Sequence, residues 1–212
     1  MVFLLSAVYP IATLLDPVVL LRSVQAPIAT LQLPKLLQIS AGSIYSNTKG
    51  VIEFDVSNRM TALKEIIEEA SHKVIVFCPF RHSIELIMTE LRKSGTTCDA
   101  IHGDVSMHKR TEIFKNFQES KDPQVLVIQP QSASHGVTLH AANVVVFWSP
   151  VMSVETYIQC CARMDRAGQK NKMTVVHLQG SPVEKKIYKM LENKIDTHTK
   201  LVDLYKEELE DV

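Results

Sequence analysis

Short apolar runs alternate with helix-like segments from residue 73 to about residue 195. The runs are continuous and rich in Val, Ile and Leu, which is typical of strands buried on both faces of a sheet. The expected strands are residues 73–78, 97–101, 124–129, 144–148 and 173–178. Strands that alternate with helices form crossover units, and the strands of such units are parallel. The pattern therefore predicts an α/β fold with a doubly wound, mainly parallel sheet and helices on both faces.

The segments between the runs have apolar residues at helical spacing, and most of them carry a start or stop signal. The expected helices are residues 57–70 after a cap at Ser57, residues 84–93 before Gly95, a helix after Ser106, residues 153–164, and a helix opened by Ser181, Pro182 and Glu184. The last of these begins with a capping box, in which a serine and a glutamate three residues later satisfy the free amides of the first turn.

Residues 1–35 differ from the rest of the chain. They contain one acid, two bases, four prolines and no glycine. Proline interrupts helices, so the apolar pieces between the prolines are too short for long helices. We expect an apolar N-terminal extension or linker, packed on the main domain or on a partner. Alternatively, residues 1–35 form an exposed apolar surface because something that normally covers them is missing. The expected division is this extension at 1–35, a main domain at 36–195 and a C-terminal helical tail at 196–212.

The composition is that of a globular protein. Of 212 residues, 46% are apolar and 22% charged, which excludes a disordered or fibrous chain. The 23 basic residues balance the 23 acidic ones, so any nucleic-acid site must be a local patch. Four cysteines without a C-x-x-C pair indicate reduced thiols. The uncharged apolar run at residues 1–15 is shorter than the ~20 apolar residues of a membrane span. We therefore expect a cytoplasmic protein, neither secreted nor membrane-bound.

Parallel doubly wound sheets bind ligands beyond the carboxyl ends of their strands, so the informative residues should follow the expected strands. After the fourth strand, Gln159, Arg163 and Arg166 are spaced by four and three residues, which places them on one helix face while the helix lasts. Two guanidinium groups near a helix end suit a phosphate chain, because each offers a planar, permanently charged fork. A structural ion pair with Asp165 or Glu155 accounts for the same pattern equally well.

The string Gln159-x-x-x-Arg163-x-x-Arg166-x-Gly168-Gln169 resembles motif VI of superfamily 2 helicases, in the form found in Swi/Snf-like DNA translocases. Three blocks before it resemble the preceding motifs in order. Residues 73–80 resemble motif IV, His102-Gly103 followed by Arg110, Phe114 and Phe117 resembles the next block, and residues 132–139 resemble motif V. The forms Cys-Pro-Phe-Arg-His and Gln-Ser-Ala-Ser-His-Gly resemble phage-encoded members in particular, which implies a host-cell cytoplasm. The resemblance covers residues 36–195.

This resemblance implies the second RecA-like lobe of an ATP-dependent motor, with ATP and Mg²⁺ in the cleft between two lobes. The first lobe supplies the phosphate loop and the magnesium-binding acids. By position in motif VI, Arg166 is the leading arginine finger and Arg163 its partner on the phosphates. Phosphoryl transfer spreads negative charge over the γ-phosphate oxygens, and an inserted arginine stabilises that charge. Gln159 and Gly136 are implied to link the nucleotide cleft to the DNA path.

The resemblance also implies contacts to the phosphate backbone of DNA, which position the strand without reading its sequence. These contacts fall on Phe80, Arg81, His102, Gly103, Ser132 and Ser134. Each of the polar or aromatic side chains also has a purely structural interpretation. His102 is alternatively a turn residue whose hydrogen bonds are made within the loop, Ser132 and Ser134 are loop caps, and Phe80 is a core residue.

Signals for the other half of the motor are absent from this sequence. It has no Gly-Lys dipeptide, hence no G-x-x-x-x-G-K-[ST] phosphate loop, and no Asp-Glu dipeptide of the acidic motif. No histidine or cysteine pair has a metal-ligand spacing, so we expect no metal site. The expected partners are therefore duplex DNA and a first lobe, in cis or in trans. The alternatives are an ATPase-inactive DNA- or protein-binding module with the same fold, and an unrelated small-molecule enzyme.

Overall fold

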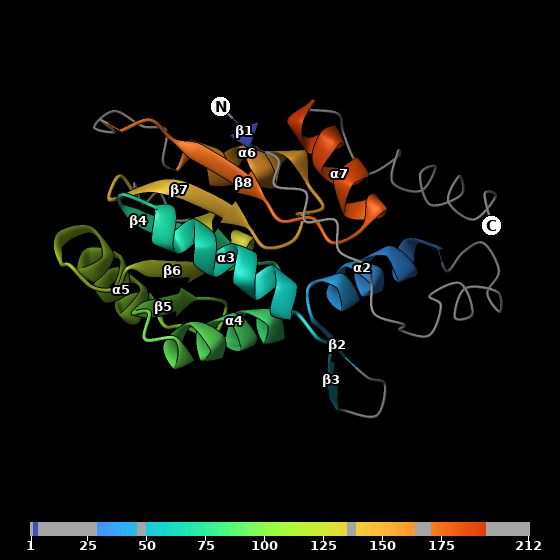
Figure 1. Cartoon of the computed structure of the whole chain (residues 1–212), viewed down its shortest axis with the longest axis horizontal. Helices are drawn as coiled ribbons and strands as arrows, with labels where there is room; N and C mark the ends of the chain where they lie inside the picture. The colour runs from blue at the N-terminus through green and yellow to red at the C-terminus, as the bar shows by residue number, and fades with distance from the viewer. Residues whose placement is uncertain (1, 4–28, 46–49, 135–138, 164–170, 194–212) are drawn as a thin grey trace.

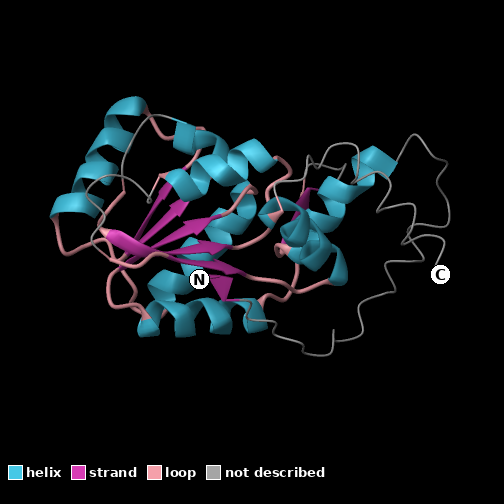
Figure 2. Ribbon diagram, turned by 90° about the horizontal axis from the view of Figure 1, so that it is seen from above, coloured by secondary structure: helices cyan, strands magenta, loops and turns pink. Residues whose placement is uncertain are grey.

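A computed structural model describes residues 2–3, 29–45, 50–134, 139–163 and 171–193. Its centre is a six-stranded sheet with the order β1-β8-β7-β4-β6-β5, in which every pairing is parallel. The strands are β1 (Val2–Phe3), β4 (Lys73–Phe77), β5 (Cys98–Ile101), β6 (Val125–Ile128), β7 (Ala142–Phe147) and β8 (Thr174–His177). Figure 2 shows helices on both sides of this sheet. The predicted fold class is confirmed.

The helices are α2 (Ala29–Ser40), α3 (Ser57–Glu69), α4 (Arg81–Lys93), α5 (Met107–Glu119), α6 (Val154–Ala162) and α7 (Pro182–Glu192), with a short 3₁₀ turn η2 at Pro130–Ser134. They are drawn with these labels in Figure 1. Ser106 and Ser181 cap α5 and α7 as predicted, accepting hydrogen bonds from the amides of Lys109 and Glu184. Gly95 follows α4 with a φ of +79°, the left-handed conformation predicted for a helix stop.

Two apolar cores fill the space between the sheet and its helices. Successive strand residues point to opposite faces, so Ile75 and Phe77 enter one core while Val74 and Val76 enter the other. The first core also receives α5, α6 and α7, and the second receives α3 and α4. Burial on both faces explains why the strands are continuous apolar runs rather than alternating ones.

The amino-terminal part of the fold contains elements that the sequence pattern did not predict. Strand β1 extends the sheet beyond β8. Helix α2 contains Pro34 and crosses the expected boundary at residue 35, and its Leu37 is buried in the first core. The expected tail at 196–212 lies outside the described residues, and the division into domains stays a prediction.

A small antiparallel hairpin stands apart from the main sheet. It pairs β2 (Ser43–Tyr45) with β3 (Val51–Glu53). Residues 51–56 alternate loosely between apolar and polar, as a short strand does, and β3 forms the first half of this run. Directly after it, the expected cap at Ser57 is wrong. Ser57 is already the first residue of α3, and the side chain of Asp55 accepts the Ser57 amide at 2.8 Å instead. Hydrogen bonds from the backbone and the side chain of Ser57 lower the pKa of the Asp55 carboxyl.

None of the helices in the described ranges is long and apolar enough to cross a membrane.

Candidate nucleotide and nucleic-acid site

All strands of the main sheet end at one edge, because they are parallel. The loops that follow β4, β5, β6 and β7 therefore gather there, and α2 and the β2–β3 hairpin lie beyond this edge (Figure 1). This edge is where doubly wound sheets bind ligands. It brings together four of the residues expected to contact DNA: Phe80 and Arg81 after β4, and His102 and Gly103 after β5.

Arg81 is the first residue of α4 and lies in a small ion-pair network. Its Nε is 3.3 Å from Oε1 of Glu85, and its Nη1 contacts the carboxylate of Asp104 in the loop after β5. The Arg81 side chain is 42% exposed. A partly exposed guanidinium held by exposed carboxylates is available to a phosphate, because ion pairs at the surface are weak and exchange readily.

The loops after β4 and β5 are joined by the side chain of Gln129. The amide of Gly103 donates to its Oε1 at 3.2 Å, and its Nε2 donates to the carbonyl of Pro79 at 3.4 Å. Gln129 was not among the site residues expected from the sequence. The sequence marks it only as a polar residue that directly follows the apolar run of β6.

Arg110 fixes the loop after β5 from the other side. Its guanidinium donates to the carbonyls of Val105, His102 and Gly103 at 2.8, 2.9 and 3.2 Å. Arg110 thus holds the backbone of the loop, whereas Arg81 remains partly exposed.

His102 is only partly buried, but its Nδ1 is enclosed without a hydrogen-bond partner among the described residues. Burial and the neighbouring Arg81 lower the pKa of the imidazole, and Glu85 opposes this shift. The neutral form of His102 is therefore favoured at neutral pH, so the ring offers a polar contact rather than a charge.

The remaining expected DNA contacts are less exposed or lie outside the described residues. Phe80 packs against both cores while lining a cavity, so its alternative as a core residue stays open. Ser132 is buried in η2, and its amide donates to the carbonyl of Gln129 at 2.8 Å. The position of Ser134 within η2 is described, but its side chain is not.

Helix α6 carries the residues expected to contact nucleotide. Ser153 caps it, and Gln159 on its exposed face donates from Nε2 to Oε1 of Glu155 at 3.1 Å. The helix ends at Ala162, two residues before the predicted end, with Arg163 as its C-cap. Arg163 is only 7% exposed. Arg166 and Gly136 lie outside the described residues.

The described residues that flank these two positions are joined by a hydrogen bond. The amide of Leu139, the last residue of the motif V block, donates to the carbonyl of Arg163 at 3.2 Å. Turn η2, which includes the first residues of that block, packs against α6. The two blocks that should share the nucleotide cleft are therefore in contact where they are described.

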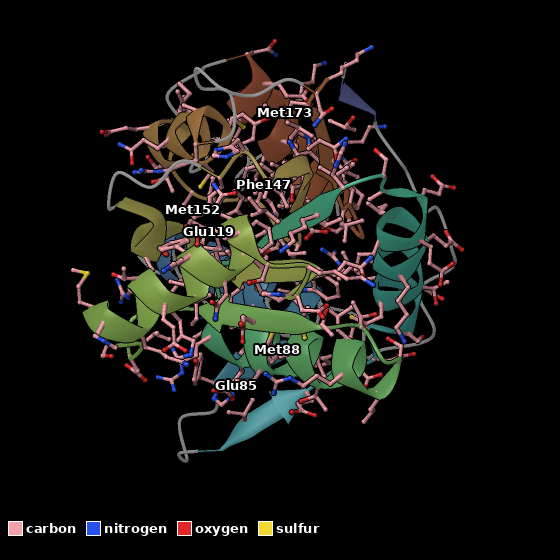
Figure 3. The ribbon with its side chains drawn as sticks, turned by 90° about the vertical axis from the view of Figure 1, so that its left-hand side faces the viewer. Glu85, Met88, Glu119, Phe147, Met152 and Met173 are labelled. Carbon is pink, nitrogen blue, oxygen red and sulfur yellow. The ribbon has the colours of Figure 1, made fainter. Side chains whose placement is uncertain are left out.

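A cavity of about 180 Å³ opens between α6, η2 and the loops after β4 and β7. Phe80, three prolines and Val151 give it an apolar wall, and Gln131, Ser153 and Thr156 add polar groups. The cavity lies between α6 and the loop after β4, which carries two of the predicted DNA contacts. Met152, which also lines it and is labelled in Figure 3, is one of the exposed apolar side chains.

A buried ion pair supports the loop that leads into α6. Arg59 of α3 donates through Nη2 to both carboxylate oxygens of Glu184 of α7, at 3.0 and 2.8 Å, and through Nη1 to the carbonyl of Trp148. Glu184 is fully buried and also accepts from the Gly180 amide at 2.7 Å and the Ser40 hydroxyl at 3.0 Å. This cluster therefore connects α2, α3 and α7 to the end of β7.

His177 at the end of β8 packs α6 against α7. Its Nε2 is 3.0 Å from the hydroxyl of Tyr157, and its ring stacks on Tyr188 with centroids 4.2 Å apart. Burial lowers the pKa of His177 to about 4. Glu192 Oε1 lies 3.2 Å from His177 Nδ1, but outside hydrogen-bond geometry. A buried, neutral and stacked imidazole acts as packing for α6 and α7.

The thiols of this edge are not nucleophiles. Burial raises the pKa of Cys78 and of Cys160 to about 12, so both stay protonated at neutral pH. No three His, Cys, Asp or Glu side chains lie close enough to hold a metal ion within the described ranges.

The family description "Helicase conserved C-terminal domain" matches residues 58–168, just over half of the chain. The chain belongs to this helicase family. The match runs from α3 to the end of the motif VI block, so it includes every loop of the carboxyl edge described above. The expectation of a helicase carboxyl-terminal domain is confirmed at this level.

Relatives of two kinds match this helicase domain. "DEAD-box ATP-dependent RNA helicase 5" of Oryza sativa subsp. japonica is 30% identical over 53% of this chain and 22% of its own length. "SNF2 domain-containing protein ENL1" of the same species is 29% identical over 64% of this chain and 14% of its own length. The chain thus spans less than a third of these relatives. Neither is phage-encoded, and the expected likeness to phage proteins stays a prediction.

Two solved structures share the fold. The C-terminal part of the Fun30 ATPase domain matches with a TM-score of 0.63 and 18% identity, over 75% of this chain and 56% of that chain. The C-terminal domain of the DEAD-box protein Dbp5 matches with a TM-score of 0.56 and 18% identity, over 66% of this chain and 79% of that chain. Both neighbours are carboxyl-terminal parts of ATPase or helicase proteins, which agrees with the fold expected for a second RecA-like lobe.

Proposed function

We propose that this helicase domain is the second motor lobe of an ATP-dependent DNA translocase or helicase, and that it supplies arginine fingers and part of a DNA-backbone track. The observation that carries the proposal is the carboxyl edge of the sheet. There, the loops of four helicase-like motifs meet, with Arg81 partly exposed and α6 hydrogen-bonded to the motif V block. The proposed main domain is residues 36–195, and the cytoplasm is the proposed compartment.

The proposed nucleotide site is shared between lobes. Arg166 is the leading finger and inserts toward the γ-phosphate, and Arg163, which is buried at the end of α6 in the chain alone, is its partner on the phosphates. Gln159 and Gly136 complete this side of the cleft. ATP and Mg²⁺ are held mainly by the first lobe, since this sequence has no phosphate loop and no acidic Asp-Glu motif. ATP supplies the phosphoryl group whose transfer drives the motor.

The proposed nucleic-acid track runs over the loops after β4, β5 and β6. Arg81 is its charged contact, and Phe80, His102, Gly103, Ser132 and Ser134 line the path. Contacts of this kind bind the phosphate backbone and suit a motor that moves over any sequence. DNA is proposed over RNA because the motif VI string has the Swi/Snf-like form, although relatives of both kinds match.

The test is to supply the missing lobe. ATP hydrolysis is measured for this chain alone, for a first lobe with a phosphate loop alone, and for the two mixed, each with and without duplex DNA. We expect DNA-stimulated hydrolysis only in the mixture, because the groups that grip the triphosphate and the finger that stabilises its transition state lie on different lobes.

A second candidate, an ATPase-inactive binding module, makes the opposite forecast for the same mixture. It requires salt-sensitive DNA binding by the chain without any gain in hydrolysis when the first lobe is added. If the mixture and the first lobe alone hydrolyse ATP at equal rates while the chain binds DNA, the result supports the binding module and contradicts the motor.

A further inference from the structure

The β2–β3 hairpin presents an aromatic ring beside the proposed DNA track. Tyr45, the last residue of β2, is 46% exposed. Its ring lies 4.9 Å from the ring of His82, centroid to centroid, at an angle of 55°. His82 follows Arg81 directly in the first turn of α4. An exposed tyrosine thus extends the surface that begins at Arg81.

The hairpin is held in this place by buried polar contacts. The hydroxyls of Ser43 and Ser83 are 3.1 Å apart and buried. The amide of Phe54 donates to the carbonyl of Gly42 at 2.9 Å, which closes the base of the hairpin. Ser43 and Tyr45 alternate onto the same face of β2, so the pairing that fixes Ser43 on α4 also turns Tyr45 toward His82. The ring is therefore positioned by the fold.

The charges around Tyr45 favour a neutral ligand over a phosphate. Arg81 is balanced by Glu85 and Asp104, and Glu85 also lies 3.2 Å from His82. Figure 3 shows Glu85 on α4 above the hairpin, and Figure 1 shows the hairpin projecting beyond the start of α4. A phosphate at the hairpin would meet the carboxylate of Glu85 beside His82, whereas a nucleobase carries no charge and gains from an aromatic face.

We propose that Tyr45, supported by His82, stacks on an unpaired base of a single strand whose backbone passes over Arg81. The inference rests on the proposed function, and it narrows the substrate to one with an unpaired strand. Aromatic side chains bind single strands in this way irrespective of sequence, because every base has a π-face, and a paired base within a duplex does not expose that face.

The experiment measures binding of the full chain to three fluorescent probes of equal length by anisotropy. The probes are a single-stranded DNA, an abasic strand with the same phosphates, and a duplex. Stacking on an aromatic residue contributes about 1–3 kcal/mol per base, so Tyr45→Ala should weaken binding of the single strand by about 5- to 150-fold. Binding of the abasic strand and of the duplex should be unchanged, and Tyr45→Phe should behave as the unaltered chain.

Arg81→Ala separates this inference from the proposed function. It should weaken all three probes, because it removes a backbone contact. If the unaltered chain binds none of the probes, the DNA track fails and the inference fails with it. If Arg81→Ala weakens binding but Tyr45→Ala changes no probe, or weakens the abasic strand as much as the complete one, the track stands and base stacking by Tyr45 is overturned.

Discussion

Replacing Arg166 by alanine is expected to reduce DNA-stimulated ATP hydrolysis of the assembled two-lobe motor by about 10³- to 10⁵-fold. The transition state spreads negative charge over the γ-phosphate oxygens, and Arg166 is the residue of motif VI proposed as the leading finger toward them. Gln159 is bonded to Glu155 on an exposed helix face, and Arg163 is buried. The measurement is the steady-state rate of phosphate release with the first lobe in excess.

Two variants control for charge and for folding. Arg166→Lys keeps the charge and loses the planar fork, so it should recover only part of the rate. Lys189→Ala removes a charge from an exposed position on α7 and should leave the rate unchanged. Thermal melts of all three variants should coincide with that of the unaltered chain. A rate for Arg166→Ala equal to that of Lys189→Ala would remove the arginine-finger assignment.

Glu184→Ala is expected to lower the free energy of unfolding by about 3–5 kcal/mol, the range found when one partner of a buried ion pair is removed. The change leaves Arg59 buried without its carboxylate and also removes the acceptor for the Gly180 amide and the Ser40 hydroxyl. Urea denaturation followed by circular dichroism measures this loss. Glu184→Gln should lose less, because the amide oxygen still accepts hydrogen bonds.

An exposed ion pair provides the matched control. Lys93 Nζ lies 2.8 Å from Glu90 Oε1 in α4, on the surface. Glu90→Ala removes this pair and should cost less than about 1 kcal/mol, because exposed pairs are screened by water and salt. The double variant Arg59→Met with Glu184→Leu should unfold at a higher urea concentration than Glu184→Ala, since it leaves no buried charge. Equal losses for Glu184→Ala and Glu90→Ala would show that the buried cluster does not hold α3, α7 and β7 together.

The parts of the fold that the sequence predicted are those with a local signal. Strands β4, β6, β7 and β8 are mostly apolar runs, and α4 shows four apolar residues at helical spacing, all of them buried. Strand β1 has two residues and β2 has three, which is too short for any periodicity to appear. Ser57 was predicted to cap α3, but the carboxylate of Asp55, two residues earlier, accepts the Ser57 amide instead. Serine and aspartate are both common helix caps, so the sequence alone did not distinguish them.

Local sequence patterns do not predict which residues far apart in the chain contact each other. Glu184 was predicted as the acid of a capping box and does accept the Gly180 amide, but its pairing with Arg59 joins residues 125 positions apart. Gln129 likewise bridges two loops that meet only because β4, β5 and β6 are adjacent in the sheet. The candidate site depends on such contacts, whereas its location at the carboxyl edge followed from the parallel sheet alone.

The measurement that tests the central claim most directly is the affinity between this chain and a first lobe in different nucleotide states. The two are titrated by calorimetry in the presence of Mg²⁺ with ADP alone and with ADP plus aluminium fluoride, which mimics the transferring phosphoryl group. Groups that serve the transition state bind its mimic more tightly than the product. The account predicts tighter association with the mimic, lost in Arg166→Ala. Association of equal strength in both states would contradict it.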